Sequence, residues 1–574
     1  MTLQFSGLTV ATSLAAAVAT ATLTAATLTT AARADGAAAR RAAALQNLKH
    51  VIVVMQENHS FDNYFGALAY TPGGIYHSVG DSHGAGKDNN LNNVNNVNNV
   101  NNVNKLADGC HPNDHLCVDG LSCKRGGDGL LTCSNSNPDD DGNTVVAFHD
   151  QNRCVRPDLD HGWLGTHLEA NFAAPNDSLR HFRGDGFVRR NDQTEQLDNG
   201  VESATEDETM GFYTEQELPF YYDLAQKFAI SDRHFCSVLG PTFPNRAYSL
   251  AATSFGHLTT SDELPPPNPL VANAGYKPLT GTIFDLLEAN AVTWAEYFQN
   301  LPAGGSFRPF AVNPDVHFMP YATFLQQVSG APGLPELPQV SFVDPSFGVN
   351  DEHPPQDVQI GQAFMSQLVN AVRNGPYWKD SIIFITYDEH GGFYDHVMPP
   401  PAPQGGARTP DGIAPGQCAD ASNLPASARA GGGAECNTNF EDPADNSVAN
   451  AEQLCPQLAA NPTGPYPAQC ASFDQLGFRV PFIAVSPFAK PGYVSHTVSD
   501  HTSVLALIEK RFMVPFVAGK VTSDHPHLTR RDQFADTLED MFDFENSPSL
   551  NTPVGTAGPP ADDCTPAASV SAEP

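Results

Sequence analysis

Acid and amide side chains directly follow two strongly apolar stretches of the sequence. Glu57 and Asn58 come after the run VIVVMQ, and Asp388 and Glu389 come after the run IIFITY. Carboxylate and amide oxygens are hard donors, which bind Mg²⁺, Ca²⁺ or Mn²⁺ and sometimes Zn²⁺. The two pairs therefore predict a site for one divalent metal ion, whose identity stays open. The alternative is that these carboxylates only cap neighbouring helices or face solvent.

A third motif, GPTFPNR, begins at Gly240 and places one hydroxyl group between a glycine and two prolines. These residues restrict the backbone, so the Thr242 hydroxyl is expected to be held rigidly before a helix. A divalent ion lowers the pKa of a bound hydroxyl, and a helix N-terminus stabilises a phosphate group. Thr242 is therefore the predicted nucleophile. The structural alternative is that Thr242 serves only as the N-cap of that helix.

Several histidines lie in polar motifs around these segments. An imidazole can protonate a leaving oxygen or bind a phosphate group. His353 is the first candidate because it precedes two prolines in a loop after an apparent strand, and His161 in DLDHGW is the second. Most of the 20 histidines must be structural or exposed, which weakens the case for His390, His396 and His501.

The elements that must position these residues alternate between strands and helices. The sequence predicts a strand within residues 46–66, a helix with proline in its first turn at 219–230, helices at 282–290 and 359–372, and short strands at 339–343, 381–387 and 480–485. Such alternation predicts an α/β fold with a parallel sheet. Ligands bind such sheets beyond the carboxyl ends of the strands, so both acid pairs should meet at one edge.

The predicted organisation is one α/β catalytic domain over residues 46–545. Two loop-rich insertions, at about 67–145 and 399–471, interrupt it, and residues 546–574 form a flexible Pro/Ala/Ser tail. Residues 91–105 repeat Asn-Asn-Val, a polar tract that cannot bury enough apolar surface to fold alone and is expected to be a flexible loop. A short solenoid turn is the alternative.

Composition narrows the location and the partners. With 41% hydrophobic residues among 574, the chain can bury a sizeable core. Its 64 acidic and 30 basic residues give a net charge of -34, which disfavours nucleic acid or an anionic lipid surface as a partner. Residues 1–34 are rich in Ala, Thr and Leu and end in Ala-Arg-Ala, which predicts a secretory signal peptide and a secreted protein, extracellular or periplasmic. A membrane anchor is the alternative; no later segment is apolar enough to span a membrane.

Eleven cysteines fit an oxidising compartment. Cys236 stands alone beside a core-like segment and is expected to be a free, buried thiol. The other ten are expected to form disulfides in the irregular regions, with a pairing that the sequence leaves open: Cys110, Cys117, Cys123, Cys133, Cys154, Cys418, Cys436, Cys455, Cys470 and Cys564.

Four ordered blocks resemble the signature motifs of the bacterial phosphoesterase family that contains acid phosphatases and phospholipases C. They are QENHSFDNYFG from Gln56, GPTFPNR from Gly240, EHPP from Glu352 and YDEHGGFYDH from Tyr387. The resemblance spans roughly residues 46–515. It implies an alkaline-phosphatase-like α/β sandwich, with a mainly parallel central sheet, helices on both faces and disulfide-linked insertions.

The resemblance also implies roles for individual residues. The metal ion would be bound by five residues, of which Thr242 is also the nucleophile: Glu57, Asn58, Thr242, Asp388 and Glu389. His161 and His353 would act on the phosphoryl group, and Asn245, His390 and His501 would bind the substrate. The Asn-rich insertion is not part of the family pattern.

The predicted function is that of a metal-dependent phosphoric ester hydrolase with a phospho-threonine intermediate. The substrate would be a phospholipid or a small phosphomonoester. The chain lacks a twin-arginine signal and the long C-terminal modules of the phosphocholine-specific phospholipases, which argues against a choline lipid. The alternative function is a non-catalytic protein that binds phosphate or metal at its surface.

Overall fold

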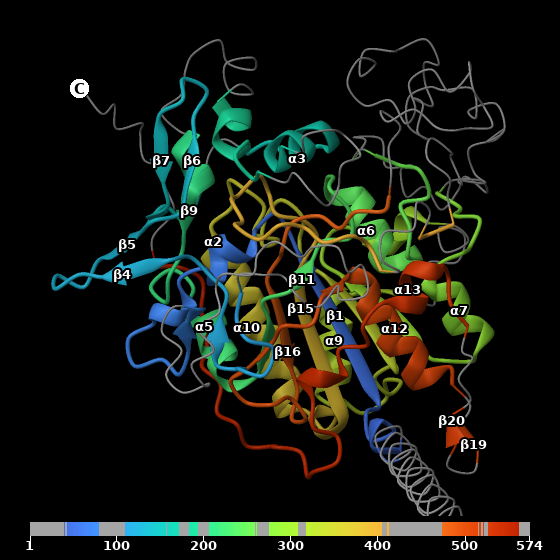
Figure 1. The fold of residues 1–574 in the computed structure, drawn as a ribbon. Coiled ribbons are helices and arrows are strands. Elements are labelled where there is room, and N and C mark those ends of the chain that lie inside the picture. The colour runs from blue at the N-terminus through green and yellow to red at the C-terminus, as the bar shows by residue number, and fades with distance from the viewer. Residues whose placement is uncertain are drawn as a thin grey trace, which may run out of the picture.

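The computed structural model describes residues 40, 43–79, 109–155, 158–171, 183–192, 206–258, 260, 275–307, 317–403, 410–412, 473–514, 516–517, 520–521 and 526–561. An eight-stranded sheet forms its centre (Figure 1). In spatial order the strands are β13 (Phe318–Pro320), β12 (Trp294–Phe298), β14 (Val340–Asp344), β1 (His50–Gln56), β15 (Ser381–Tyr387), β16 (Phe482–Val485), β10 (Ala229–Ser231) and β17 (Tyr493–Ser495).

The sheet is mainly parallel, as predicted. Every neighbouring pair runs parallel except the two pairs that include β16, which is antiparallel to both β15 and β10. The strand predicted at 480–485 is thus present as β16, but it does not run with the others. All seven residues of β15 are buried, which is expected when helices cover both faces of a sheet.

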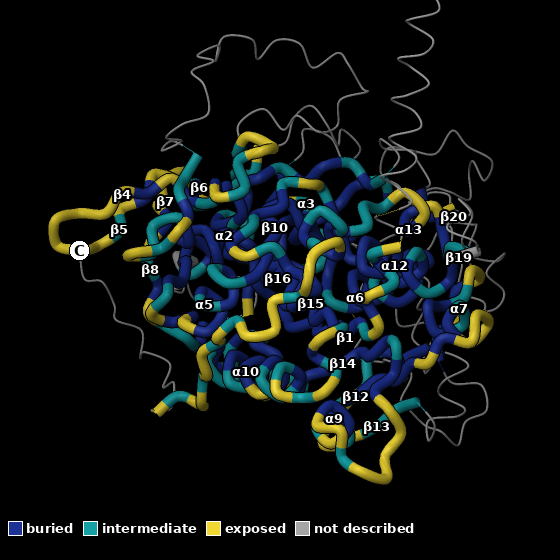
Figure 2. The backbone as a smooth tube through the Cα atoms, turned by 90° about the horizontal axis from the view of Figure 1, so that it is seen from below, coloured by how far each residue is buried: buried dark blue, intermediate teal, exposed yellow. Residues whose placement is uncertain are grey.

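Helices lie on both faces of this sheet, and the two views agree on this arrangement (Figures 1 and 2). On one side lie α5 (Pro219–Lys227) and α10 (Val358–Asn374), and on the other lie α6 (Thr242–Ala251), α12 (His501–Phe512) and α13 (Arg530–Phe534). The helices predicted near residues 219, 282 and 359 are confirmed as α5, α7 (Ile283–Ala289) and α10. Figure 2 shows the central strands of the sheet as buried, whereas the edge strand β13 is partly exposed.

Local chemistry explains where these helices begin. Pro219 occupies the first turn of α5, where its missing N–H costs nothing. The Thr282 side chain accepts a hydrogen bond from the Asp285 backbone and completes a capping box at α7. The Asp357 side chain caps α10 by accepting from the Gln359 backbone. None of the long amphipathic helices reaches a length or hydropathy that would let it cross a membrane, within the part of the chain that was searched.

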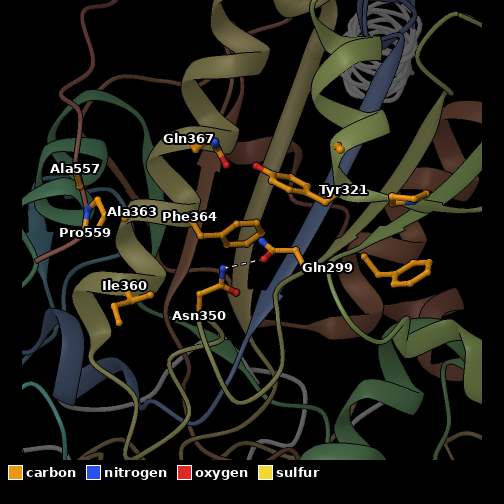
Figure 3. Close-up of a pocket in the computed structure, with 12 residues that line it drawn as sticks. Gln299, Tyr321, Asn350, Ile360, Ala363, Phe364, Gln367, Ala557 and Pro559 are labelled. Atoms are coloured by element: carbon orange, nitrogen blue, oxygen red, sulfur yellow. Dashed lines mark hydrogen bonds between the residues drawn. The ribbon is translucent and has the colours of Figure 1, made fainter. Parts of the chain in front are cut away.

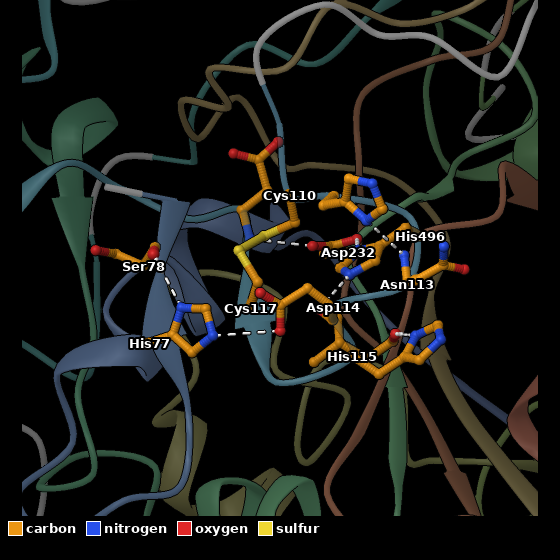
Figure 4. Close-up of a disulfide and its surroundings, with 12 residues drawn as sticks. His77, Ser78, Cys110, Asn113, Asp114, His115, Cys117, Asp232 and His496 are labelled. Carbon is orange, nitrogen blue, oxygen red and sulfur yellow. Dashed lines mark hydrogen bonds and ion pairs between the residues drawn. A yellow bond between two sulfur atoms is a disulfide. The ribbon is translucent and has the colours of Figure 1, made fainter. Parts of the chain in front are cut away.

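The first predicted insertion contains short strands and two disulfides. Cys110 pairs with Cys117, and Cys123 pairs with Cys133 across the hairpin of β4 (Cys123–Arg125) and β5 (Leu131–Cys133). Figure 4 shows the first disulfide beside the pairs His77–Asp114 and His496–Asp232. Cys154 is also disulfide-bonded. Cys236 is free and buried, which confirms that prediction.

Other predicted features fall outside the described residues: the signal peptide, the Asn-Asn-Val tract, residues 413–470 of the second insertion, and the last part of the tail. The described part of the tail, residues 546–561, lies along α10. The backbone oxygen of Leu550 accepts a hydrogen bond from the Trp378 indole (3.2 Å), and the Ala557 N–H donates to the Ser366 hydroxyl (2.9 Å). These residues are therefore tied to the helical layer by specific hydrogen bonds.

Candidate active site

Adjacent strands bring the two acid pairs together. β1 and β15 are parallel neighbours, and their last residues, Gln56 and Tyr387, are in register. The residues that follow each strand must therefore emerge side by side, and the Asn58 N–H donates to Asp388 Oδ1 at 3.3 Å. We call Glu57, Asn58, Asp388, Glu389 and Arg246 the acid edge.

The backbone is shaped for this close approach. Asn58 has a positive φ of 64°, a conformation that few residue types other than glycine tolerate. Gly391 also has a positive φ (65°), and a Cβ at this position would lie 2.2 Å from the Asn58 carbonyl oxygen. Only glycine fits there. The YDEHGG motif thus allows the two strand ends to touch.

Arg246 joins helix α6 to the acid edge. Its Nε lies 3.0 Å from Asp388 Oδ2, and its Nη2 lies 3.1 Å from Glu57 Oε1. Because residues four apart share one face of a helix, this contact turns the face that carries Thr242 toward the acid edge. Arg246 ends the GPTFPNR motif, but its residue type and spacing alone did not predict this contact.

Thr242 is the first residue of α6, and Pro241 is the N-cap. In the described part of the chain, its partly buried hydroxyl makes no hydrogen bond, so the structural alternative of an N-cap is wrong. Asn245 lies fully buried and bonds to the loop before Thr242. Its Nδ2 donates to the Gly240 oxygen at 2.8 Å, and its Oδ1 accepts from the Val238 N–H at 3.0 Å. In this arrangement Asn245 holds the loop in place, and its amide is already bonded to backbone groups.

Two buried oxygens of the acid edge have no hydrogen bond within the described residues, Asn58 Oδ1 and Glu389 Oε1. An unpaired buried acceptor costs about 1–3 kcal/mol, so such atoms rarely persist without a partner. A bound cation would satisfy both. The donor set, an amide and carboxylates, fits the hard divalent ions that the sequence predicts. The residues present therefore fit a metal ion.

Burial and mutual repulsion dominate the charges of the acid edge. Burial raises the pKa of Glu57 well above its usual value and that of Asp388 to about 6, and Arg246 offsets part of both shifts. Burial also opposes ionisation of Glu389, but the imidazoles of His161 and His390 bring its pKa below the usual value. The acid edge therefore contains more carboxyl groups than positively charged groups.

His161 and His353 lie beside the acid edge. His161 Nε2 is 3.8 Å from Glu389 Oε1 and 3.5 Å from Asn58 Nδ2. Burial alone would lower the pKa of His161, but Glu389 and Asp158 raise it to about 10. The His353 ring lies 6.3 Å from the His161 ring, centroid to centroid, and is partly exposed. The structure thus brings both predicted catalytic histidines to one place.

His390 and His501 are fully buried and contact protein groups. His390 Nε2 lies 2.8 Å from Glu169 Oε2, and its Nδ1 lies 3.5 Å from Glu389 Oε2. Burial would lower the pKa of His390, but Glu169 and Glu389 raise it to about 9. His501 Nε2 donates to the Asp388 carbonyl oxygen at 2.7 Å. Both side chains therefore hold the Asp388–Glu389 segment from inside, and their predicted role in substrate binding stays a prediction.

Glu352, the first residue of the EHPP block, is a buried anchor, a role that its sequence motif did not predict. It accepts hydrogen bonds of 2.5 Å from the hydroxyls of Tyr64, Tyr221 and Tyr387, and one of 3.1 Å from Gln56 Nε2. Burial raises its pKa to about 7. Gln56 and Tyr387 end the two strands that carry the acid pairs, so this anchor fixes both strand ends against the loop that carries the predicted catalytic histidine.

A cavity of about 710 Å³ opens near the same end of the sheet (Figure 3). It lies between β12, α9 (Tyr321–Val328), α10 and the tail. The Asn350 side chain, three residues before His353, donates to Gln299 Oε1 at 3.2 Å across it. Its lining mixes aromatic and amide side chains, among them Phe298, Gln299, Tyr321, Asn350, Phe364 and Gln367.

Comparison with known proteins places the chain among phosphoesterases. A model of the Phosphoesterase family matches residues 48–515. Non-specific phospholipase C1 of Arabidopsis thaliana is 29% identical over 410 residues, which cover 69% of this chain and 62% of the plant protein. Phospholipase C A of Mycobacterium tuberculosis is 26% identical over 533 residues, which cover 89% of this chain and 80% of that protein.

Similarity to solved structures is weak. Murine ectonucleotide pyrophosphatase / phosphodiesterase 5 shares 10% identity and a TM-score of 0.25, over 55% of this chain and 94% of that one. A TM-score this low gives no information about the fold, so the alkaline-phosphatase-like sandwich stays a prediction. The family match, in contrast, contains all four motifs and most of the chain. The chain therefore belongs to the Phosphoesterase family.

Proposed function

We propose that the protein is a metal-dependent phosphoric ester hydrolase of the phospholipase C or acid phosphatase type. The observation that carries this proposal is the position of two unsatisfied buried oxygens, Asn58 Oδ1 and Glu389 Oε1, beside a helix that begins with a free threonine hydroxyl. The family and the names of its curated relatives support the reaction class.

One divalent ion would be held by the residues that the sequence analysis selected: Glu57, Asn58, Asp388 and Glu389, with Thr242 as a fifth ligand. When bound, the ion lowers the pKa of the threonine hydroxyl and offsets phosphate charge. The Arg246 guanidinium forms ion pairs with both Glu57 and Asp388, so it holds these two carboxylates in place. Its fixed positive charge also reduces their mutual repulsion.

The proposed reaction is a double displacement. The Thr242 hydroxyl releases its proton to solvent as its Oγ attacks phosphorus, and the bond between phosphorus and the leaving oxygen breaks. His353 or His161 gives a proton to the leaving alcohol. Water then attacks phosphorus and gives a proton back to the histidine, the Oγ–phosphorus bond breaks, and the Thr242 oxygen takes a proton from solvent as the phosphate product is released. The N–H groups at the start of α6 stabilise the negative charge of the phosphoryl group.

The substrate would be a phosphate ester, either a phospholipid or a small phosphomonoester, and not a nucleic acid. We also place the mature protein outside the cytoplasm, as a secreted protein. The disulfides Cys110–Cys117 and Cys123–Cys133 support this location, because disulfides persist mainly in oxidising compartments. Mass spectrometry of protein from the culture medium would check it: an N-terminus at Asp35 supports signal cleavage, and retention of residues 1–34 contradicts it.

The central test compares a phosphatidylcholine analogue with an aryl phosphate, each with divalent metal supplied or removed by a chelator. Turnover of either substrate that is lost with the chelator supports the proposal, and the preferred substrate identifies the type. If neither substrate is hydrolysed when metal is supplied, the non-catalytic alternative remains.

The nucleophile is tested by substitution. Thr242→Ala should lower kcat by at least about a thousandfold, whereas Thr242→Ser retains a hydroxyl and should keep measurable activity. The phospho-threonine should be trapped by acid quenching in Thr242 protein and be absent from Thr242→Ala. Unchanged hydrolysis by Thr242→Ala would remove this residue from the mechanism.

A further inference from the structure

A group of possible metal ligands lies away from the acid edge, where α12 meets α13. Glu509 lies near the C-terminal end of α12, Asp532 lies in α13, and His527 lies in the segment just before α13. Each offers one ligand atom, and these atoms all lie within 4.8 Å of one another. Figure 1 shows α12 and α13 packed side by side. The proposed reaction uses none of these three residues.

The two carboxyl groups are buried, and one of their oxygens has no partner. Glu509 and Asp532 are both fully buried. Glu509 Oε2 lies 2.9 Å from His527 Nδ1, but Glu509 Oε1 makes no hydrogen bond in the described part of the chain. Burial and the neighbouring Asp532 carboxyl raise the pKa of Glu509 well above its usual value. A cation among the three side chains would give Oε1 a partner and remove the repulsion between the carboxylates.

Backbone groups hold the Asp532 carboxylate in a fixed orientation. Its Oδ2 accepts a hydrogen bond from the Leu528 N–H at 2.6 Å, and its Oδ1 accepts one from the Thr529 N–H at 2.8 Å. Carboxylates that bind metal ions are commonly oriented by hydrogen bonds of this kind. The Thr529 hydroxyl also donates to the Ala252 carbonyl oxygen at the end of α6 (3.0 Å), so the segment is fixed to that helix as well.

Another histidine–glutamate pair shows what a simple ion pair looks like in this molecule. His149 Nε2 also lies 2.9 Å from Glu217 Oε2, and the His149 side chain is 14% exposed, against 15% for His527. Unlike Glu509, Glu217 leaves no buried oxygen without a hydrogen bond among the residues that the structure describes. Within the same residues, no third His, Cys, Asp or Glu donor completes a group around this pair. The pair of Glu509 and His527 differs in both respects.

We propose that Glu509, His527 and Asp532 bind a divalent ion such as Zn²⁺ or Mn²⁺, which links α12 to α13. Imidazole suits Zn²⁺, and carboxylates suit Mn²⁺ and also bind Zn²⁺. The ligand atoms of one ion with bonds of ~2.0–2.2 Å lie ~3–4 Å apart, so only a small movement is needed. His527, which is partly exposed, can make it. It binds through Nδ1, which faces Glu509, and keeps its ring proton on Nε2.

This ion would stabilise a helix that supports the acid edge. α12 begins at His501, whose Nε2 donates to the Asp388 carbonyl oxygen at 2.7 Å. An ion near the other end of α12 would fix the helix to α13, and through Thr529 to α6. Its expected effect is therefore on stability, because a ligand that binds only the folded state stabilises it. The proposal does not depend on the proposed function.

The test removes one ligand and counts the ions that remain. Metal-free protein is loaded with Zn²⁺ and dialysed, bound Zn²⁺ is counted by elemental analysis, and Tm is measured by calorimetry with and without Zn²⁺. His527→Ala should bind one equivalent fewer than the unsubstituted protein and should lose part of the rise in Tm that Zn²⁺ causes. This difference of one equivalent is expected whether or not the acid edge also binds an ion. Glu509→Gln keeps the size of its side chain and should lose the same equivalent.

His149→Ala is the matched control, because it breaks a pair of equal length and similar exposure. It should bind as much Zn²⁺ as the unsubstituted protein. An unchanged Zn²⁺ count in His527→Ala would overturn the proposal and would leave a proton shared by Glu509 and Asp532 as the explanation of the buried pair. If His527→Ala does not fold, the count in Glu509→Gln decides in the same way.

Discussion

Two buried clusters of charge differ in how completely they are paired. In the acid edge, Asn58 Oδ1 and Glu389 Oε1 have no hydrogen bond among the described residues. In the second cluster, every nitrogen of the fully buried Arg479 guanidinium donates a hydrogen bond. It contacts both Asp395 oxygens (2.9 and 3.1 Å), Asp62 Oδ1 (3.0 Å), and the carbonyl oxygens of Asp119 (2.7 Å) and Asp232 (3.1 Å).

Buried charge alone therefore does not identify a functional site. Both clusters bury several carboxylates around one arginine, but only the acid edge leaves polar atoms without a partner. We call the second cluster the Arg479 network. It is saturated, which means that its buried polar atoms all have partners, so no group is free to bind a ligand. A buried cluster with unpaired polar atoms can still bind a ligand, and its desolvated groups are the ones expected to bind or react.

The largest expected effect comes from breaking the saturated cluster. Arg479→Met leaves Asp395 buried without its cation and Asp62 with only His396, so the free energy of unfolding should fall by about 3–5 kcal/mol. Urea denaturation measures it. Lys124→Met, at an exposed position of β4, is the control and should change stability by less than about 0.5 kcal/mol. An equally small loss for Arg479→Met would mean that the Arg479 network is not structural.

The second prediction concerns the unsaturated cluster. Glu57→Gln removes one of several close carboxyl groups, so we expect metal affinity to fall by at least about 10–100-fold, since even residues that only support metal ligands have effects of that size. The unfolding free energy of the metal-free protein should change by less than about 1 kcal/mol, because lost repulsion offsets the lost contact with Arg246. Calorimetric metal titration and urea denaturation measure the two quantities. If Glu57→Gln lost as much stability as Arg479→Met, the proposed difference between the two clusters would be wrong.

The third prediction is a pH window for the Arg479 network, in which His396 bridges Asp62 (2.6 Å) and Asp119 (3.3 Å). Burial would lower the pKa of His396, but the two carboxylates raise it to about 10 from 6.5. Its stabilisation is therefore complete below pH 6.5 and is lost as pH rises through about 10.

The carboxylates act in the opposite direction. Although burial opposes ionisation, His396 and Arg479 lower the pKa of Asp62 below 3.8, so its contribution is present above that pH and is lost as pH falls further. The stability gap between the protein and His396→Gln should thus be widest from about pH 4 to 6.5 and close toward pH 10. Urea denaturation across this range measures the gap, and a gap that does not vary with pH would contradict the ionic interpretation.

The smallest effect is expected at Glu352, which lies next to the acid edge but is saturated like Arg479. Tyr221→Phe removes one of its four hydrogen bonds, so stability should fall by about 0.5–1.5 kcal/mol. Tyr222→Phe is the neighbouring control, since it loses only a bond to a neutral carbonyl, that of Tyr213 (3.1 Å). If the control variant were destabilised more in urea than Tyr221→Phe, Glu352 would not be the anchor described above.

Local pattern was enough to predict the elements on which the acid pairs sit. The strand predicted at 381–387 is β15 residue for residue, because an apolar run bounded by polar residues reports on burial of that segment alone. Such a run carries no information about direction. The strand predicted at 480–485 was therefore recognised as a strand, while its antiparallel orientation between β15 and β10 was not.

The sequence by itself determined the chemistry that is present: acids and an amide after two apolar strands, and one hydroxyl in a rigid loop. Tertiary structure decided which groups are partners. It paired Arg246 with Glu57, 189 residues away, and Arg479 with Asp62, 417 residues away. The physical reason is that a backbone segment responds to the polarity of its own side chains, whereas the partner of a buried charge depends on which distant segments the sheet and helices bring into contact.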